Sequence, residues 1–266
     1  MSGGSKEGIL NLMTRTLVIA NQKGGIGKST TAANIGRALT ERGFQVLLID
    51  LDPQGGLSAA LGVDSYDVQF GSHIFLLHDS APIYRVTQQV SDNLFLMPAS
   101  LHLTVAEIQL ARRTDAVIRL RDALQRQPSP ADFIIMDTPP TLGILTANGL
   151  VAADELIIPV QCQYLAMRGV RTMMQAMQRL QKNVNPSLRL LGVLATLYQA
   201  ESLHSQEALG EMRSVFKHKM FETILAYDDI MAEAPVAGKS IIDYAPTHPA
   251  AHAYRALATE IINRGN

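Results

Sequence analysis

One stretch near the start of the chain combines residue types that together suit the binding of a polyphosphate. It reads TLVIANQKGGIGKSTT from Thr16 to Thr31, and three of its glycines fall within four residues: Gly24, Gly25 and Gly27. Glycines leave backbone N–H groups uncovered, so that these groups can donate to phosphate oxygens. Lys28 is long enough to reach the outer phosphates, and the Ser29 hydroxyl is a ligand that Mg²⁺ accepts. The stretch therefore predicts a phosphate loop, with a plain glycine-rich turn as the alternative.

Acidic residues follow two other apolar runs, at positions where they could complete such a site. Residues 45–49 predict a buried strand followed by Asp50 and Asp52. Residues 133–136 predict another buried strand, followed by Asp137. Ligands of open α/β sheets bind beyond the carboxyl ends of the strands, so we expect these carboxylates beside the phosphate loop. An acidic residue at such a strand end is the usual second Mg²⁺ anchor, and the alternative role for Asp137 is to cap the helix that follows.

The elements that would position these residues alternate along the chain in the manner of βαβ units. Apolar runs predict strands over 16–20, 45–49, 93–97, 133–136, 155–160, 188–198 and 220–225. Helical periodicity predicts helices over 29–41, 165–181, 203–216 and 247–263, while residues 61–89 predict a loop with a short helix. We therefore expect an α/β fold with a mostly parallel central β-sheet and helices on both faces.

A further long helix is expected between Thr104 and Pro128. Thr104 and Glu107 match a capping box, and apolar residues continue a helical stripe toward Pro128. Its arginines predict a solvated outer face: Arg112, Arg113, Arg119, Arg121 and Arg126. The single cysteine, Cys162, excludes an internal disulfide and fits a reducing cytoplasm, and it follows an apolar run in which a buried, inert thiol is expected.

Length and composition favour one sizeable soluble domain. Hydrophobic residues make up 47% of the 266 residues and charged residues 18%, and no apolar run approaches the roughly 20 residues that span a bilayer. We expect residues 1–14 to form a flexible N-terminal arm and residues 15–266 to form the domain. The net charge of −1 gives no overall attraction to nucleic acid, so such binding would need a local basic patch.

Three segments together resemble the ParA/MinD family of dimerising ATPases and, within it, the ParA/Soj-type partition ATPases. They are NQKGGIGKSTT at 21–31, LLIDLDPQG at 47–55 and IIMDTPP at 134–140. The first segment has Gln22 where an ordinary P-loop has its leading glycine, and it carries a second lysine, Lys23, as in the family's deviant Walker A motif. AEAPVAGKSIIDYAP and HPAAHAYRALATEI are also similar to the C-terminal region of ParA.

The resemblance implies a P-loop ATPase whose slow, partner-stimulated hydrolysis of ATP with Mg²⁺ controls a nucleotide-sandwich homodimer. Lys23 would reach across the dimer interface to the partner's nucleotide, Lys28 would hold the β- and γ-phosphates, and Asp52 would orient the attacking water. The nucleotide-binding residues would be Lys23, Gly24, Gly25, Ile26, Gly27, Lys28, Ser29, Thr30 and, near the adenine, Pro235. The residues around the metal ion would be Ser29, Asp50 and Asp137.

The sequence departs from the resemblance where DNA is concerned. ParA-type proteins that bind double-stranded DNA without sequence preference place arginines in two segments, after the strand 188–198 and before the AEAP stretch, where this chain has three acidic residues: Glu201, Asp228 and Asp229. Because phosphate contacts dominate nonspecific affinity, we expect DNA binding to be weakened. Basic residues elsewhere form a candidate DNA patch, for which surface solvation is the alternative: Arg189, Arg213, Lys217, His218 and Lys219.

The leading hypothesis is an ATP-dependent partition ATPase that segregates a chromosome or plasmid with a ParB-like activator, in the cytoplasm and in association with the nucleoid. The alternative is a ParA-like ATPase that positions a protein assembly or polar complex with weak or no DNA binding. Other classes fit less well, because the nitrogenase iron protein needs two cysteines per chain and no constellation suggests the substrate pocket of a ligase such as dethiobiotin synthetase. A membrane role like that of MinD would need a basic amphipathic tail, so no membrane partner is expected.

Overall fold

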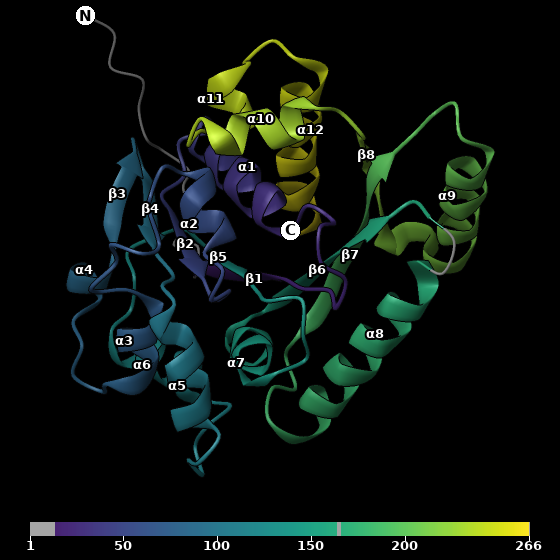
Figure 1. The fold of residues 1–266 in the computed structure, drawn as a ribbon. Helices are drawn as coiled ribbons and strands as arrows, with labels where there is room; N and C mark the ends of the chain where they lie inside the picture. The colour runs from purple at the N-terminus through teal and green to yellow at the C-terminus, as the bar shows by residue number, and fades with distance from the viewer. Residues whose placement is uncertain (1–13, 164–165, 266) are drawn as a thin grey trace, which may run out of the picture.

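The computed structural model describes residues 14–163 and 166–265, and the predicted arm 1–14 lies outside them except for Thr14. These described residues contain eight strands: β1 Arg15–Ile19, β2 Val46–Asp50, β3 Gln88–Ser91, β4 Leu94–Met97, β5 Phe133–Asp137, β6 Glu155–Gln161, β7 Arg189–Tyr198 and β8 Met220–Ala226. They form one sheet in the order β3-β4-β2-β5-β1-β6-β7-β8 (Figure 1). All neighbours in it are parallel except β3 and β4.

Helices cover both faces of this sheet. They are α1 Lys28–Thr40, α2 Gly56–Ala60, α3 Ser72–Leu77, α4 Ile83–Val86, α5 His102–Leu110, α6 Arg119–Arg126, α7 Ile144–Ala152, α8 Ala166–Asn183, α9 Leu203–Phe216, the short 3₁₀ turn η1 Lys217–Lys219, α10 Ile230–Val236, α11 Ile241–Tyr244 and α12 Pro249–Arg264. Figure 1 shows α1 and α10 to α12 on one side of the sheet and α7 and α8 on the other. The expected α/β fold with a mostly parallel sheet is confirmed.

Alternation of side chains along the strands creates a hydrophobic core on each face of the sheet. Leu17 and Ile19 of β1 pack with α1 and α12, where Ile35 and Tyr254 are almost fully buried. Val18, between them in sequence, points to the opposite core, which includes residues of α5, α6, α7 and α8. Because both faces are covered, the central strands are apolar throughout, which is why they were readable as continuous apolar runs.

The predicted long helix between Thr104 and Pro128 is wrong, because the chain forms two helices, α5 and α6. Thr104 lies inside α5, whose N-cap position is Leu101, so the predicted capping box is also wrong. The turn between the helices is held by Asp115, whose carboxylate accepts hydrogen bonds from Arg113 at 2.8 Å and from Arg119 at 3.1 Å.

Arg119 also corrects the prediction of a solvated arginine face. Its side chain is almost fully buried, donates to the Leu76 carbonyl oxygen at 2.9 Å and pairs with Asp79 at 2.7 Å. These partners belong to a segment more than 35 residues earlier in the chain. The contact therefore ties α6 to α3 and could not be inferred from helical spacing.

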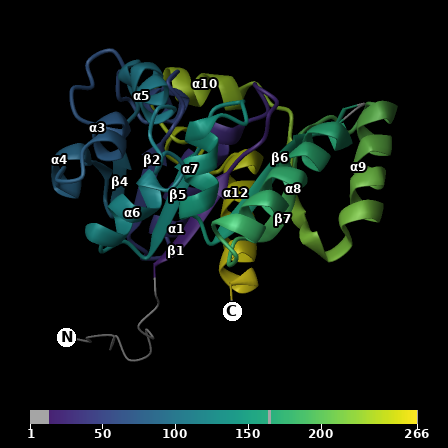
Figure 2. The same ribbon diagram turned by 90° about the horizontal axis from the view of Figure 1, so that it is seen from below.

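The parallel strands bring their carboxyl ends to one edge of the sheet. The turn that follows β1, the end of β2 and the end of β5 meet there, since Asp50 lies in register with Asp137 and Ile19 pairs with the same residue. Figure 2 shows α5 and α10 at this end of the molecule and the last turns of α12 at the other. Within the described residues, none of the helices has both the length and the apolar character that crossing a bilayer requires.

Candidate nucleotide site

The turn between β1 and α1 has the backbone conformation of a loop that can wrap around an anion. Gly25 and Gly27 have φ angles of 68° and 84°, in the left-handed region that other residues rarely adopt. Gly27 is the N-cap of α1 and provides no side chain that could accept from the first N–H groups of the helix. Those donors and the positive end of the helix dipole face the loop, so the predicted phosphate loop has a backbone suited to phosphate.

Lys28 stands at the first turn of α1 and is only 7% exposed. Its Nζ donates to the carbonyl oxygen of Lys23 at 3.3 Å, which bends the side chain back over the loop. Burial lowers the pKa of Lys28, while the neighbouring Asp137 and Asp52 carboxylates oppose that shift. A buried cation held over a ring of backbone donors is what a bound polyphosphate would neutralise.

Asp137, the last residue of β5, is fully buried, and neither of its carboxylate oxygens has a hydrogen-bond partner of normal geometry among the described residues. Burial raises its pKa well above the usual value, and repulsion from Asp50 adds to this, while the nearby Ser29 hydroxyl and Lys28 favour the ionised form. A buried carboxylate without a donor is costly unless a cation joins it. Asp137 therefore fits the predicted role of a metal anchor.

Asp50, at the end of the neighbouring strand β2, is equally buried, but both of its carboxylate oxygens accept hydrogen bonds from nearby residues. One oxygen accepts from the Asp52 N–H at 3.0 Å, and the other accepts from the N–H and hydroxyl of Ser58 at 2.9 and 2.7 Å. Burial raises its pKa to about 6, although the Ser58 bonds work in the opposite direction. Asp50 thus fixes the turn after β2 and gives the site a second negative charge, while Asp137 has the free oxygens.

The residues around Asp137 fit a hydrated divalent cation. Ser29 lies in the first turn of α1, and Gly56 approaches it so closely that a Cβ at position 56 would be 3.0 Å from the Ser29 hydroxyl. One hydroxyl and one free carboxylate are the hard oxygen ligands that Mg²⁺ takes, with water and phosphate oxygens completing its shell. These oxygen donors are compatible with the predicted Mg²⁺. In the described part of the chain, no cluster of three His, Cys, Asp or Glu side chains could hold a metal ion by itself.

Asp52 follows the turn after β2 and is partly exposed. Its Oδ1 accepts from the Gln54 N–H at 3.0 Å, which orients the carboxylate but leaves its other oxygen without a hydrogen bond in the described structure. Its charge is close enough to raise the pKa of Lys28. The prediction that Asp52 lies beside the phosphate loop therefore agrees with its position, and its role toward water remains a prediction.

Lys23 leaves the phosphate loop in a different direction from Lys28. Its Nζ donates to the side-chain oxygens of Gln161 at 2.7 Å and Gln163 at 3.1 Å, at the end of β6, and both bonds are exposed. Asn21, at the start of the loop, holds the loop against β6, because its side-chain amide donates to the Pro159 carbonyl oxygen at 2.7 Å. Nothing in the sequence pattern identified Asn21 or the two glutamines as partners of the loop.

The predicted adenine contact, Pro235, lies in α10, which packs against α2 and α11. Met231, one turn earlier in the same helix, lines a small cavity beside the phosphate loop together with Gly27, Thr196 and Tyr254. The structure thus brings the helix of Pro235 to the site. Met231 was missed because a lone methionine in an alanine-rich stretch carries no chemical signal.

The residues of the predicted DNA patch gather at the opposite edge of the sheet. Arg189 begins β7 and donates to the buried Glu155 carboxylate at 2.7 Å, and Lys219 immediately precedes β8. Arg213 and Lys217 lie exposed at the end of α9 and in η1. The acidic residues lie at the carboxyl edge, where Asp228 accepts from the Ile230 N–H at 3.1 Å. The structure therefore separates the basic residues from the phosphate loop.

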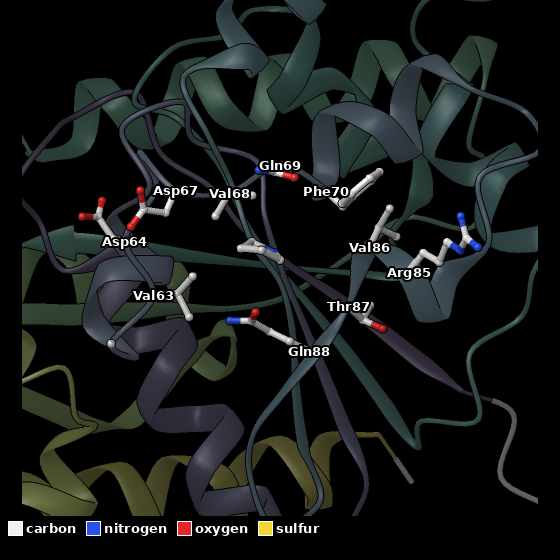
Figure 3. Close-up of a pocket in the computed structure, with 12 residues that line it drawn as sticks. Val63, Asp64, Asp67, Val68, Gln69, Phe70, Arg85, Val86, Thr87 and Gln88 are labelled. Atoms are coloured by element: carbon white, nitrogen blue, oxygen red, sulfur yellow. The ribbon is translucent and has the colours of Figure 1, made fainter.

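A further cavity lies near the β3–β4 edge of the sheet, away from these residues (Figure 3). Val63, Val68 and Gln88 point toward its middle, whereas Asp64 and Asp67 lie along one side. None of the residues predicted to bind nucleotide, metal or DNA lines this cavity. We therefore place the candidate site at the phosphate loop alone.

Comparison with known proteins identifies the family of the chain. Residues 14–190 match the model of a family described as an AAA domain. The chain is 37% identical to the sporulation initiation inhibitor protein Soj of Bacillus subtilis (95% of this chain, 100% of the relative) and 39% identical to the chromosome-partitioning ATPase Soj of Thermus thermophilus (96% and 98%). A solved structure described as cobyrinic acid a,c-diamide synthase from Mycobacterium smegmatis, with bound ATP analogue and magnesium, has a TM-score of 0.83 at 36% identity (95% and 96%). The chain belongs to the Soj/ParA family of P-loop ATPases.

Proposed function

We propose that this protein is a partition ATPase, in which binding of ATP and Mg²⁺ builds a homodimer and hydrolysis takes it apart. The names of the Soj relatives, which describe chromosome-partitioning ATPases, support the biological role. The observation that carries the chemistry is the Asp137 carboxylate, buried and without a hydrogen bond beside Ser29 and Lys28. A cation that binds together with the nucleotide would neutralise this buried carboxylate and so explain why the fold tolerates it.

Each side chain at the loop then has a definite task. The N–H groups at the start of α1 and the Lys28 ammonium hold the phosphates, and Ser29 and Asp137 hold Mg²⁺, directly or through water. The metal ion supplies charge neutralisation for the phosphoryl group being transferred. Asp52, whose carboxylate is oriented by the Gln54 N–H, positions the water for in-line attack on the γ-phosphate.

The dimer step is assigned to Lys23. Its two acceptors, Gln161 and Gln163, are neutral, and both hydrogen bonds are exposed, so water can replace them when Lys23 is released. A lysine so weakly held can turn toward the nucleotide of a second copy. Hydrolysis would therefore depend on the partner, and a ParB-like activator could act on the assembled dimer.

For DNA, we infer that nonspecific binding uses the basic residues at the amino edge of β7 and β8. Phosphate contacts there would come from Arg213, Lys217 and Lys219, since the Arg189 guanidinium already pairs with Glu155. The acidic Glu201, Asp228 and Asp229 repel DNA from the other edge, which keeps the phosphate-loop face free for the second copy. The alternative proposal, that the ATPase positions a protein assembly, requires no such patch.

A synthase activity, as named for the Mycobacterium smegmatis protein, is a second candidate. Amide synthesis through a covalent enzyme intermediate needs an activated nucleophile, and a thiolate is the most nucleophilic side chain at neutral pH. The only cysteine here, Cys162, is 2% exposed, and burial raises its pKa to about 11. The chain therefore offers no thiolate for that step, which favours the partition ATPase.

A salt series of DNA binding separates the two leading roles. Wild-type protein with an ATP analogue and Mg²⁺ is titrated into a labelled duplex of arbitrary sequence at several salt concentrations, beside a triple variant in which Arg213, Lys217 and Lys219 are changed to glutamine. We expect affinity that falls with salt, and that the variant lowers further. No affinity of the wild type at low salt would refute DNA binding and leave the protein-positioning role.

A further inference from the structure

A small basic cavity lies at the amino edge of the sheet, beside β7 and β8. Its volume is about 170 Å³, and six residues line it: Arg189, Leu190, Leu191, His218, Lys219 and Arg264. Two arginines, a lysine and a histidine thus share its wall, and no carboxylate of the described residues lines it. A recess whose charged groups are all cationic attracts an anion.

Arg264, near the end of α12, is held in a fixed position at this cavity. Its guanidinium donates to the Leu191 carbonyl oxygen at 3.1 Å and to the Met220 carbonyl oxygen at 2.5 Å. It also lies over the Phe221 ring, with 4.2 Å between Cζ and the ring centroid. Gly192 leaves room for it, because a Cβ there would be 2.8 Å from Nη1. These neutral partners orient the guanidinium without neutralising its charge.

The carboxylate that pairs with Arg264 is engaged mainly by other donors. Glu260 lies 3.6 Å from the Arg264 guanidinium, which is longer than a hydrogen bond. Its two oxygens accept from the Glu222 N–H and the Thr223 N–H, both at 2.8 Å, and from the Thr223 hydroxyl. Glu260 is therefore held against β8, and the positive charge of Arg264 is only partly offset.

Arg189 also lines the cavity, with part of its guanidinium unused. Nε and Nη2 donate to one oxygen of Glu155 at 3.1 and 2.7 Å, whereas Nη1 has no hydrogen bond within the described residues. Glu155 is shared with Arg15, whose Nη2 donates to its other oxygen at 2.6 Å. The neighbouring Asp154 carboxylate accepts from the Thr16 N–H at 2.9 Å. The Nη1 edge of Arg189 can therefore serve an acceptor that the chain itself does not supply.

His218 and Lys219 complete the cavity from η1, the turn between α9 and β8. Both side chains are exposed, and within the described residues neither of them belongs to an ion pair. The Lys219 ammonium can turn its three donors toward a ligand, while the guanidinium of Arg264 stays fixed. The cavity thus combines a fixed cation with a movable one.

We propose that this cavity binds one phosphate group. A phosphate has up to two negative charges and several oxygens, which suits arginine and lysine donors that approach from different elements. Pockets for whole small molecules usually measure about 300–1,000 Å³. A cavity of about 170 Å³ is therefore suited to a phosphate group and too small to enclose a nucleotide. The group is either free inorganic phosphate or part of a nucleic-acid backbone, since both present the same oxygens.

The cavity is separate from the phosphate loop. The last turns of α12, which carry Arg264, lie at the end of the molecule opposite to α10 (Figure 2). For a nucleic-acid ligand the inference rests on the proposed function, because it shares Lys219 with the DNA contacts proposed above. It adds Arg264, which lies 45 residues from Lys219 in the sequence, so that no local pattern connects the two.

The test is a titration with inorganic phosphate. Full-length protein is saturated with a nonhydrolysable ATP analogue and Mg²⁺, so that the phosphate loop is filled, and phosphate replaces chloride at constant pH and ionic strength. The ring resonances of His218 are followed by NMR and are assigned with His218→Gln. We expect them to move along a saturation curve, because a phosphate in the cavity lies beside this ring. A shift that does not saturate would overturn the inference.

Three substitutions that remove one positive charge each show where the phosphate binds. Lys219→Gln and Arg264→Gln should raise its dissociation constant at least about tenfold, because each removes a charged donor. Arg85→Gln is the control, since Arg85 is exposed on α4, beside the β3 edge of the sheet, and should leave the constant unchanged. Arg264 also supports β8, so Lys219→Gln decides if Arg264→Gln fails to fold. Unchanged affinity in Lys219→Gln, or equal losses in the control, would overturn the inference.

A short duplex of arbitrary sequence identifies the source of the phosphate. Displacement of inorganic phosphate by the duplex would support the cavity as a site for a nucleic-acid backbone, and binding of phosphate unaffected by the duplex would support it as a site for free phosphate. The inference and the proposed function fail separately. DNA binding without a saturable phosphate site would overturn the cavity and keep the DNA role, whereas a chain without ATPase activity would overturn the proposed function and leave the phosphate titration valid.

Discussion

Replacing Asp137 by asparagine should stabilise the protein without ligand and weaken its response to Mg²⁺ and nucleotide. The carboxylate is fully buried without a hydrogen bond in the described structure, and burial together with the Asp50 charge raises its pKa. At pH 8 the unfolded chain carries this aspartate ionised at no cost, whereas the folded state must either bury the charge or bind a proton. The ionised form therefore opposes folding.

The magnitude follows from the cost of an unsatisfied buried group. An asparagine keeps the size and the hydrogen-bonding need but removes the charge, so we expect the free energy of unfolding in EDTA to rise by about 1–3 kcal/mol. For a chain of this size that corresponds to a melting temperature higher by about 2–5 °C. With ATP analogue and Mg²⁺ at 100 times the dissociation constant, the wild type should gain about 2.7 kcal/mol. The variant should lose most of the Mg²⁺-dependent part of this gain.

Thermal melts of both proteins in EDTA and in Mg²⁺ with the analogue measure all four values. The expected pattern is a crossing, with the variant more stable without ligand and less stable with it. A variant that is strongly destabilised in EDTA would show that the Asp137 carboxylate supports the fold. An unchanged Mg²⁺-dependent gain would show that the metal ion binds elsewhere. Either result would refute the reasoning.

Three further predictions concern the same site. Lys28→Ala should abolish nucleotide binding in calorimetry, because the backbone of the loop alone neutralises little phosphate charge; retained affinity would contradict this. Asp52→Ala should bind ATP normally but stop turnover in a phosphate-release assay and accumulate dimers, and measurable turnover would remove its assigned role. Burial raises the pKa of Asp50 to about 6, so between pH 3.8 and 6 the folded state holds a proton that the unfolded state has lost. The free energy of unfolding of the wild type, relative to that of Asp50→Asn, should therefore fall by at most about 3 kcal/mol as pH rises through this range. The variant comparison is needed because burial lowers the pKa of His73 to about 4, which has the opposite effect of destabilising the protein as pH falls; parallel pH curves of the two proteins would contradict the Asp50 prediction.

Much of the fold was predictable because its signals are local. The strands β1, β2, β5 and β6 are apolar runs buried on both faces, and the glycines at 25 and 27 mark left-handed backbone in the loop. The positions of Asp50 and Asp137 at strand ends followed from parallel topology. The short edge strand β3 was missed, since its residues Gln88–Ser91 are mostly polar and partly exposed.

What could not be predicted depends on partners distant in sequence. Arg119 is buried because the Leu76 carbonyl and Asp79 lie beside it, and no helical pattern reveals those neighbours. The difference between Asp50 and Asp137 is of the same kind. Both are acidic residues at strand ends, and only the position of Ser58 in the fold shows that Asp50 is satisfied and Asp137 is free.

The action of Lys23 across two copies is tested most directly by mixing two inactive variants. Lys23→Ala keeps its own Asp52, and Asp52→Ala keeps its own Lys23, so in a mixed dimer the nucleotide bound by the Lys23→Ala copy has both groups. With equal amounts, half of the dimers are mixed and half of their sites are complete, so we predict ATPase activity of up to about a quarter of the wild type. A mixture as inactive as its two components would contradict the transfer of Lys23 to a second copy.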